Sequence, residues 1–381
     1  MEDTKRKIVF INQATGYLTI DIINAFVDNF DEIILIAGSV RIQDIPLSDS
    51  VKFVKIITYN RGNPLKKLLS WLLGTLQIYI LLLFKFPKHE TFYVTVPPTA
   101  YLLSRILPNK FSILVYDIYP DALKVFNISE NNYFYRKWQQ WNALLFSKAH
   151  KIYTLGDAMK KVLSNYIDPS KIIVINNWSG LINLSPINKK KNPFVIQHNL
   201  TNKFIVTYSG NIGHTHNVET LIRLAEEFRN SPDIIFLIIG RGNRFFTIKE
   251  LINSQRLTNC LLLPFQPDSE IQYSLAAADI SVIILDEKVS KASIPSKTYN
   301  LLAVGSAFMC IGSNDTELAG FVRKYNIGKS FMQNNIHEMA TFIKESKIDS
   351  TILQKYKQNS LQLSKDYTFK NAELYLKYYL R

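Results

Sequence analysis

Residues 292–310 read ASIPSKTYNLLAVGSAFMC and join three patterns that rarely meet in so short a stretch. A polar, proline-bearing start is followed by a helical pattern over 295–304, and Gly305 then stands where glycine commonly follows a helix. The apolar run from Ala307 onward suits a strand that is buried on both faces. A helix that leads directly into such a strand predicts an α/β fold with a parallel sheet.

The same alternation extends along the chain in both directions. Apolar, β-rich runs such as KIVFIN, EIILIAG, TFYVTV and FSILVYDI alternate with helical patterns in the first half, and the alternation restarts at KFIVTYSG. Such strands, separated by helices, are typical of a parallel sheet covered on both faces. We therefore predict two Rossmann-like, doubly wound domains that face a cleft. The domains are predicted at 1–178 and 203–349, with an Asn-, Lys- and Pro-rich linker at 179–202 and terminal helices at 350–381.

Composition limits the classes of function. Hydrophobic residues make up 47% of the 381 residues and charged residues 20%, which predicts a large packed core. The formal net charge of +14 favours an anionic partner. Because no zinc-finger spacing or RNA-recognition motif occurs, a lipid surface or a phosphate-bearing substrate is favoured over nucleic acid. Cys260 and Cys310 lie in apolar runs and indicate buried thiols in a reducing cytoplasm, and the polar N-terminus predicts no secretory signal.

The stretch LLSWLLGTLQIYILLLF, residues 68–84, contains no charged residue and is flanked by Lys66, Lys67, Lys85 and Lys88. It is slightly shorter than the ~20 residues that usually span a bilayer. Two compatible interpretations remain. The stretch is either a core helix of the first domain or a helix that lies partly in the bilayer interface with lysines at its ends.

The stretch from Pro295 has the features of an anion-binding site. Pro295 is expected in the first turn of a helix, where its missing N–H has no cost. Ser296, Lys297 and Thr298 then lie at the end where unpaired N–H groups and the helix dipole favour a negative ligand. A lysine there opposes the dipole, and a diphosphate between the lysine and the helix would explain it. The alternative is a solvated surface lysine.

Two glycine-bearing loops follow strands of the same predicted domain. In YSGNIGHTHNVETL, Gly210 and Gly213 free the backbone before a helix, which offers N–H groups to an anion, and His214 and His216 could each bond a phosphate. The alternative for this loop is an ordinary tight turn. Neither histidine has the partner spacing of a metal site.

The next strand ends in IIGRGNRFF, where Gly240, Arg241 and Gly242 stand together. The third glycine of a dinucleotide-binding fingerprint is missing, because Phe245 occupies that position. The motif still suits a backbone that approaches a base or a ribose closely.

The first domain offers a carboxylate at a strand end. In LVYDIYPDALKVF, Asp117 follows a strand that is expected to be buried, and it is the best candidate to handle a substrate hydroxyl. Asp121 could instead cap the next helix. Gly16, in NQATGY after the first strand, would leave the floor of the cleft free of side chains.

The order and spacing of these motifs resemble the GT-B glycosyltransferases, specifically the family 4-like enzymes of bacterial surface-polysaccharide (O-antigen and capsule) assembly. The resemblance covers nearly the whole chain and is strongest over 203–329. It is carried by YSGNIGHTHNVETLI, FLIIGRGNR, LLLPFQPDSEIQYSLAAADISVI, IPSKTYNLLAVGSAF, DIYPDAL and VINNW. It implies a nucleotide-sugar donor held mainly by the second domain, an acceptor held mainly by the first, and a terminal helix able to cross back to the first domain.

The resemblance also implies roles for single residues. Lys297 and Asp117 are the predicted catalytic residues. The predicted donor-binding residues are Gly16, Gly210, Asn211, Gly213, His216, Gly240, Arg241, Gly242, Ser296, Lys297, Thr298 and Asn300. Two departures stand out: Asn300 replaces a glutamate that such enzymes commonly use for the ribose, and the usual basic pair of the first glycine loop appears as Asn211 and His216.

The predicted function is hexosyl transfer from a nucleoside-diphosphate sugar, with UDP as the first choice, to a hydroxyl of a lipid-linked glycan. The resemblance implies retention of configuration, and the absence of a DxD motif predicts no metal; no other cofactor is expected. The protein is expected in the cytoplasm or on the inner face of the cytoplasmic membrane. The alternatives are a nucleotide-sugar epimerase or hydrolase on the same fold, and a non-catalytic, membrane-associated partner in glycan assembly.

Overall fold

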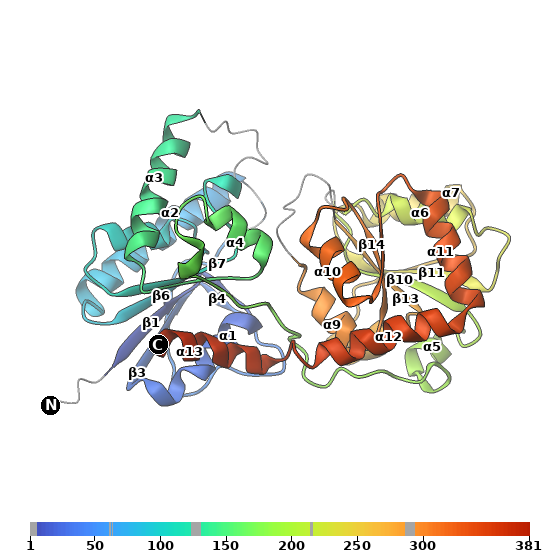
Figure 1. Ribbon diagram of the computed structural model, residues 1–381, viewed down its shortest axis with the longest axis horizontal. Coiled ribbons are helices and arrows are strands. Elements are labelled where there is room, and N and C mark those ends of the chain that lie inside the picture. The colour runs from blue at the N-terminus through green and yellow to red at the C-terminus, as the bar shows by residue number, and fades with distance from the viewer. Residues whose placement is uncertain (1–5, 61, 63, 123–130, 214–215, 286–293) are drawn as a thin grey trace. The chain divides into compact units, whose positions relative to one another are not determined.

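The computed structural model describes residues 6–60, 62, 64–122, 131–213, 216–285 and 294–381 (Figure 1). The chain forms two compact units: a first unit of Met1–Ile182 with Thr368–Arg381, and a second unit of Asn183–Tyr367. Each unit has its own parallel sheet with helices around it. The predicted α/β fold with two Rossmann-like domains is therefore confirmed.

The first unit is built on a seven-stranded sheet with the order β5-β3-β1-β6-β7-β8-β9. Its strands are β1 (Lys7–Ile11), β3 (Glu32–Ala37), β5 (Lys52–Lys55), β6 (Glu90–Val94), β7 (Phe111–Val115), β8 (Lys151–Thr154) and β9 (Ile172–Val174). A separate short pair is formed by β2 (Ala14–Thr15) and β4 (Ser39–Val40). The central strands β1 and β7 are buried almost throughout, as their continuous apolar sequences require.

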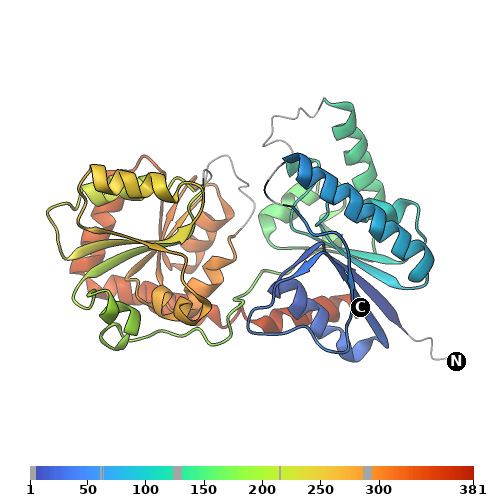
Figure 2. The same ribbon diagram turned by 180° about the vertical axis from the view of Figure 1, so that it is seen from behind.

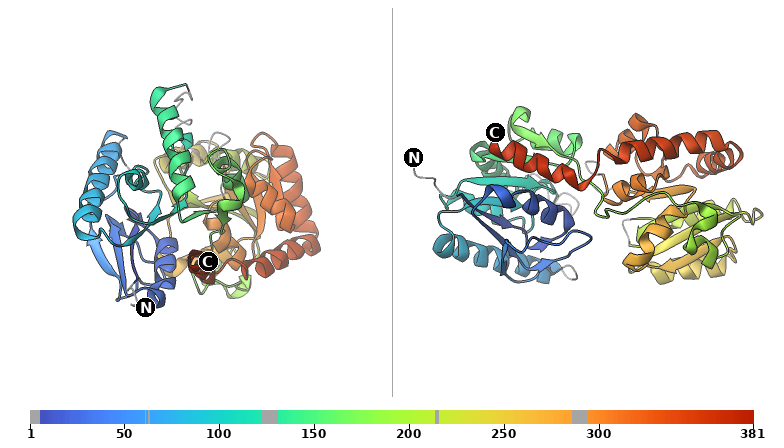
Figure 3. Two further views of the ribbon diagram at one scale, coloured as in Figure 1. Left: turned by 60° about the vertical axis from the view of Figure 1, so that its left-hand side comes forward. Right: turned by 90° about the horizontal axis from the view of Figure 1, so that it is seen from below.

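Helices cover both faces of this sheet. The first unit contains α1 (Tyr17–Ala25), α2 (Pro64–Ile80), α3 (Tyr133–Lys148), α4 (Asp157–Leu163) and α13 (Ala372–Leu380). Shorter turns of helix are η1 (Val27–Asn29), η2 (Leu81–Lys85, a π-helix), η3 (Ala100–Arg105), η5 (Pro169–Lys171) and η7 (Phe369–Asn371). Helices α1 and α13 lie side by side on one face, and α2 and α3 lie on the other (Figures 1 and 3).

The last helix, α13, completes the core of the first unit. The ring of Tyr375 lies 4.9 Å from that of Tyr153, and the ring of Tyr379 lies 5.2 Å from that of Phe26. The Tyr379 hydroxyl donates to Glu90 Oε2 at 2.6 Å. Because these rings are buried, the final residues of the chain are part of the first unit's core.

The second unit is built on a six-stranded sheet with the order β12-β11-β10-β13-β14-β15. Its strands are β10 (Phe204–Asn211), β11 (Ile234–Arg241), β12 (Cys260–Pro264), β13 (Ile280–Ile284), β14 (Ala307–Ile311) and β15 (Gly328–Phe331). Its helices are α5 (Pro193–Gln197), α6 (Glu219–Glu226), α7 (Phe245–Ser254), α8 (Asp268–Ala276), α9 (Lys297–Ala303), α10 (Glu317–Tyr325), α11 (Ile336–Ile348) and α12 (Ser350–Ser364), with the short turn η6 (Lys189–Lys191).

The unit boundaries differ from the predicted segments. The stretch 179–202 is not a plain linker, because it contains α5, whose Phe194 and Val195 are buried in a core cluster of the second unit. The predicted terminal segment 350–381 is divided between the units, since α12 belongs to the second and α13 to the first. A helix of five residues with two core side chains leaves too weak a periodic pattern to be found in a polar sequence.

The apolar stretch 68–84 forms α2 and the π-helical turn η2. It is buried on one side only: Ser70, Gly74, Ile78 and Leu82 face the protein, while most of its leucines are exposed. The segment Leu65–Lys85 is long and apolar enough to cross a membrane by length and composition. Because one side of this helix is exposed, it is not a fully buried core helix.

Two neighbouring strands of the second unit approach each other closely where they end. Gly210 of β10 is in register with Gly240 of β11, and a Cβ on Gly240 would lie 2.0 Å from the Gly210 carbonyl oxygen. The atom that such a Cβ would meet belongs to the backbone of β10, and this backbone cannot move away without breaking the sheet. Only glycine fits at position 240.

We predict that Tyr375→Ala destabilises the first unit by about 3–5 kcal/mol, because it removes a buried aromatic ring. The measurement is urea unfolding followed by fluorescence. The matched control is Leu380→Ala, which shortens an exposed side chain of the same helix. Equal stability of the two variants would contradict the assignment of α13 to this core.

We predict that Gly240→Ala lowers the unfolding free energy of the second unit by about 1–3 kcal/mol or more, since the added methyl overpacks a backbone contact. Gly320→Ala is the control, because nothing lies within 4 Å of a Cβ there. Within α10 that change should stabilise slightly, by up to ~1 kcal/mol. Thermal unfolding that shifts both variants in the same direction would refute this prediction.

Candidate functional site

The carboxyl edge of the second unit's sheet brings together the side chain of Lys297 and the glycine loops. Lys297 Nζ lies 3.1 Å from the position that a Cβ of Gly210 would occupy. The first residue of α9 therefore lies over the end of β10. The absence of a side chain at Gly210 leaves room for the ammonium group there.

The environment of Lys297 is unusual for a lysine. Its Nζ lies 4.5 Å from the centroid of the Tyr208 ring, and the residue is half-buried. Burial lowers the pKa of Lys297 to about 8, while the nearby Cys310 thiol acts in the opposite direction. Within the described residues, no carboxylate lies within ion-pair distance of Lys297 Nζ. An ammonium group held against a ring without a counterion is suited to an anionic ligand.

The two glycine loops are fixed against each other by backbone bonds. Ile212 N–H donates to the Arg241 carbonyl at 2.8 Å, and Arg244 N–H donates to the Ile212 carbonyl at 3.1 Å. Gly242 has a φ of +152°, and a Cβ there would lie 2.3 Å from the Ile212 carbonyl oxygen. The loop ends of β10 and β11 thus form one rigid surface.

The polar residues Asn211 and His216 lie at this surface. Asn211 is exposed, and its carbonyl accepts a hydrogen bond from the Tyr208 hydroxyl at 2.7 Å. The Asn211 side-chain nitrogen lies 2.8 Å from the Cβ position of Gly213. His216 is half-buried, and its backbone N–H donates to the Gly213 carbonyl. His214 lies outside the described residues.

Arg241 extends the site away from Lys297. Its guanidinium lies 4.8 Å from the centroid of the Phe265 ring, and both residues are exposed. Phe265 directly follows β12, so it stands at the same carboxyl edge as Gly240 and Gly242. A ring and a guanidinium beside a close backbone form a flat surface on which a planar group can stack.

The start of α9 differs from the predicted one. The helix begins at Lys297 with Ser296 as its N-cap, so Pro295 precedes the helix and is not in its first turn. The N–H groups of Thr298 and Tyr299 already donate to the carbonyls of Pro295 and Ser296, at 2.9 and 3.2 Å. The N–H groups of this turn are therefore only partly available to a ligand.

The remaining predicted residues of α9 lie at different depths. Ser296 is exposed and Asn300 is half-buried. Thr298 is fully buried, and its hydroxyl has no hydrogen-bond partner in the described part of the chain. The Thr298 side chain therefore does not share the surface formed by Lys297 and the glycine loops.

In the first unit, Asp117 follows β7 at the carboxyl edge of the sheet. The N–H groups of Tyr116 and Asp117 donate to Thr95 Oγ1 at 3.0 and 3.3 Å, which fixes the backbone of this loop. The residue is exposed, yet desolvation by the surrounding protein raises the pKa of its carboxyl group, and the charge of Lys67 acts against that shift.

An aromatic cluster lies near this carboxylate, because the charge of Asp117 acts on Tyr119. Trp71 of α2 lies 6.0 Å from Tyr59 and 5.8 Å from Tyr119, and Tyr119 stacks on Trp138 of α3 at 5.8 Å. Lys67 Nζ lies 4.8 Å from the Trp71 centroid. The Trp71 indole N–H is buried and has no hydrogen-bond partner among the described residues. This group was not predicted from the sequence, because Trp71 and Trp138 lie within helices and only the fold brings them next to the loop residues Tyr59 and Tyr119.

Two other predicted positions of the first unit have structural roles or none. The Asp121 carboxylate accepts hydrogen bonds from the hydroxyls of Tyr135, at 2.9 Å, and Tyr166. Gly16 is the N-cap of α1 with an ordinary φ of −121°, and nothing lies within 4 Å of a Cβ there. Gly16 also belongs to the first unit, whereas the other predicted donor-binding residues belong to the second.

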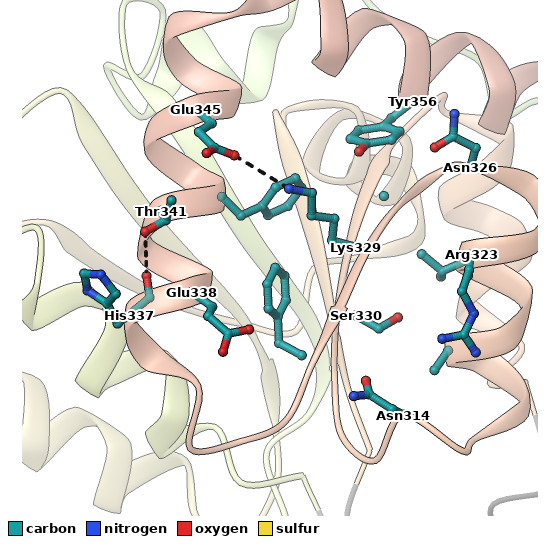
Figure 4. A pocket seen from close by; sticks show the side chains of 15 residues that line it. Asn314, Arg323, Asn326, Lys329, Ser330, His337, Glu338, Thr341, Glu345 and Tyr356 are labelled. Atoms are coloured by element: carbon teal, nitrogen blue, oxygen red, sulfur yellow. Dashed lines mark hydrogen bonds and ion pairs between the residues drawn. The ribbon is translucent and has the colours of Figure 1, made fainter.

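A large cavity of about 670 Å³ lies elsewhere in the second unit, along the edge strand β15 between α10 and α11 (Figure 4). Its lining includes the ion pair of Lys329 with Glu345, at 3.6 Å, and the side chains of Arg323 and His337. None of the predicted site residues lines it. The described residues also contain no cluster of three or more His, Cys, Asp or Glu side chains suited to a metal ion.

Comparisons with known proteins show which family and fold this chain resembles. Residues 188–362 match the family described as Glycosyl transferases group 1. The chain is 22% identical over 246 residues to the probable glycosyltransferase WbjE of Pseudomonas aeruginosa. This match covers 64% of this chain and 61% of WbjE. It is 27% identical over 165 residues to the putative colanic acid biosynthesis glycosyl transferase WcaI of Escherichia coli K12, covering 42% of this chain and 40% of WcaI. The chain thus spans less than two thirds of the length of either relative.

Among solved structures, Anabaena HepE in complex with UDP superimposes with a TM-score of 0.71 at 15% identity, covering 97% of this chain and 98% of HepE. This likeness concerns the fold. The family match, in contrast, covers the strands and helices that carry Lys297 and both glycine loops. Residues 188–362, nearly the whole second unit, therefore match the Glycosyl transferases group 1 family, and the fold of the whole chain is that of HepE.

Proposed function

We propose that this protein transfers a glycosyl group from a nucleoside-diphosphate sugar to a hydroxyl of a glycan. The observation that carries the proposal is the Lys297 ammonium, half-buried over Tyr208, adjacent to the side-chain-free end of β10 and without a carboxylate partner in the described part of the chain. In this proposal the diphosphate lies between Lys297 and the loop Gly210–Gly213. The group 1 family match supports it.

The nucleoside is assigned to the end of β11. The Arg241–Phe265 pair offers a stacking surface for the base, and the ribose is proposed to lie beside the loop that contains Gly240 and Gly242. Asn300, one turn into α9, remains the proposed partner of a ribose hydroxyl. UDP is the first candidate, and the solved complex of HepE with UDP supports this choice.

The chemistry follows from these positions. The bond between the anomeric carbon and the diphosphate oxygen breaks, and the acceptor oxygen forms the new bond to that carbon. Lys297 stabilises the negative charge that develops on the leaving diphosphate, which is usually the largest single contribution to such catalysis. The acceptor proton passes to the departing phosphate oxygen, and the configuration at the anomeric carbon is retained. Because the sequence has no DxD motif, no metal is included.

The acceptor is assigned to the first unit. Asp117 orients the reacting hydroxyl, and the rings of Tyr59, Trp71 and Tyr119 provide apolar faces against which sugar rings pack. The net charge of +14 and the exposed apolar side of α2 support a lipid-linked glycan at the cytoplasmic side of a membrane.

We predict that the affinity for UDP is constant near neutral pH and falls as the pH rises above about 8. Above its pKa, Lys297 must take up a proton before it can pair with the phosphates, so the affinity falls by up to about tenfold per pH unit. Calorimetry between neutral and alkaline pH measures this dependence. A thermal-shift comparison of UDP, GDP, CDP and dTDP first establishes the nucleotide.

Lys297→Met should weaken binding by about 10- to 100-fold and abolish the pH dependence, because a charged hydrogen bond contributes about 1.5–3 kcal/mol. Lys249→Met is the control, since Lys249 is an exposed lysine of α7. An unchanged pH profile in Lys297→Met would assign the effect to another group.

We predict that Lys297→Ala lowers the rate of transfer from a nucleotide sugar to a glycan acceptor by about 10²-fold or more, as for other groups that stabilise a leaving group. Asp117→Asn should lower it by about tenfold or more, chiefly through acceptor KM. Asp157→Asn, an exposed residue of α4, is the control. Wild-type transfer rates in both site variants would reject this site. Rapid turnover of the donor without an acceptor would reject a transferase and would indicate a hydrolase or epimerase.

A further inference from the structure

The outer side of α2 and η2 exposes a continuous apolar surface. Its residues recur every three or four positions, which places them on one side of a helix. Those of α2 are between 47% and 65% exposed: Leu65, Leu68, Leu69, Leu72, Leu73, Leu76 and Ile80. Leu83 and Phe84 of η2 extend the row, and Phe84 is 77% exposed. In Figure 2 this helix, in blue, lies on the surface of the first unit, and no other described element of that unit covers its outer side. We call this row the leucine face.

The opposite side of the same helix is fixed to the protein. Ile78 and Leu82 are fully buried, Gln13 Nε2 donates to the Ser70 carbonyl at 2.8 Å, and Ile57 N–H donates to Gln77 Oε1 at 2.8 Å. The segment is 21 residues long, which would suffice to span a bilayer. Spanning would break these bonds and bury their polar partners in lipid. The geometry therefore favours a helix that lies along a membrane surface.

The charges around the leucine face define its partner. Residues 51–116 contain nine lysines and arginines and one acidic residue, Glu90. Glu90 is already paired with Arg6 and Lys110, at 3.2 and 3.0 Å. Lys66 and Lys85 are exposed at the two ends of the helix. An apolar row with basic ends matches a bilayer that carries anionic headgroups.

A second copy of this chain is a poorer partner for the same surface. A two-fold interface pairs identical patches. Because both ends of the leucine face are basic, either antiparallel or parallel pairing of two such helices brings lysines against lysines. An anionic bilayer satisfies both the apolar row and its charges.

A segment next to α2 exposes further apolar and basic side chains. Helix η3 packs against both α2 and α3, and Ile106, directly after η3, is exposed. Arg105 of η3 lies 4.8 Å from the Trp141 ring of α3. Arginine and tryptophan side chains combine an apolar body with a polar end, which suits the boundary between headgroups and acyl chains.

We propose that the first unit docks on anionic lipid bilayers through the leucine face, with α2 and η2 lying in the headgroup region parallel to the membrane. The same helix carries Lys67 and Trp71, which border Asp117 and Tyr119. Docking therefore holds the proposed acceptor site at the membrane surface. Where the proposed function holds, the acceptor is a glycan attached to a lipid of that membrane.

The test is flotation of the full-length protein with vesicles of phosphatidylcholine alone and of phosphatidylcholine mixed with phosphatidylglycerol. The wild type is expected to float with the anionic vesicles, and added salt should weaken this binding. The variant Leu69→Glu/Leu72→Glu/Leu76→Glu should lose about tenfold or more of its binding, since each glutamate places a charge in the apolar boundary. The matched control Phe246→Glu/Ile348→Glu changes exposed apolar residues of the second unit and should bind like the wild type. Circular dichroism establishes that each variant is folded.

Several outcomes would overturn the proposal. Wild-type protein that does not float with anionic vesicles would contradict lipid binding. A leucine-face variant that binds as well as the wild type would contradict the role of the leucine face. Protein that resists alkaline carbonate extraction would contradict the surface orientation, because such resistance is typical of a spanning helix. A wild-type dimer in sedimentation that the leucine-face variant converts to a monomer would instead assign the surface to a second copy. Flotation requires neither donor nor acceptor, so vesicle binding without transfer would reject the proposed function alone. Transfer to a water-soluble acceptor should be unchanged in the leucine-face variant.

Discussion

The approach of the Gly240 Cα to the Gly210 carbonyl oxygen constrains the whole carboxyl edge of the second sheet. Because no side chain fits between β10 and β11 there, the two strands end together and their loops bond to each other through Ile212, Arg241 and Arg244. This rigid edge leaves a space over Gly210, and Lys297 Nζ lies in it. Lys297 Nζ therefore occupies a space that is open because Gly210 has no side chain. A larger residue at either glycine would remove the space and the close backbone at the same time.

The two units share a fold and differ in the charge at their sheet ends. In the second unit the central group is a cation over an aromatic ring, and burial lowers its pKa. In the first unit it is the carboxylate of Asp117 near Tyr119, and desolvation raises its pKa. In each case the protein disfavours the charged form of the free group, so that a ligand of opposite charge, or a hydroxyl that can donate to the carboxylate, is favoured. Such groups are poor contributors to stability and good candidates for function.

The sequence predicted the elements well and their surroundings less well. Strands such as β1, β7, β10 and β11 are continuous apolar runs because both faces of a parallel sheet are covered, and that pattern is local. The pairing of Lys297 with Gly210 was also within reach, since both follow strand ends of one sheet. Tyr208 and Phe265 were missed because an aromatic residue at a strand end looks like core until the neighbouring loop is placed. Likewise, α5 was missed because only Phe194 and Val195 mark its buried side.

Helix α2 shows why hydropathy alone could not decide between core and interface. Its buried side contains Ser70 and Gly74, which are small because the side chain of Gln13 packs against them, whereas its exposed side is almost entirely leucine. The usual relation between apolarity and burial is reversed along the first half of the helix. A protein that met only water on that side would gain stability and solubility from polar residues there, at no cost to packing. Leucines on that surface, with lysines at both ends, are explained by a second apolar phase that the helix meets outside the protein.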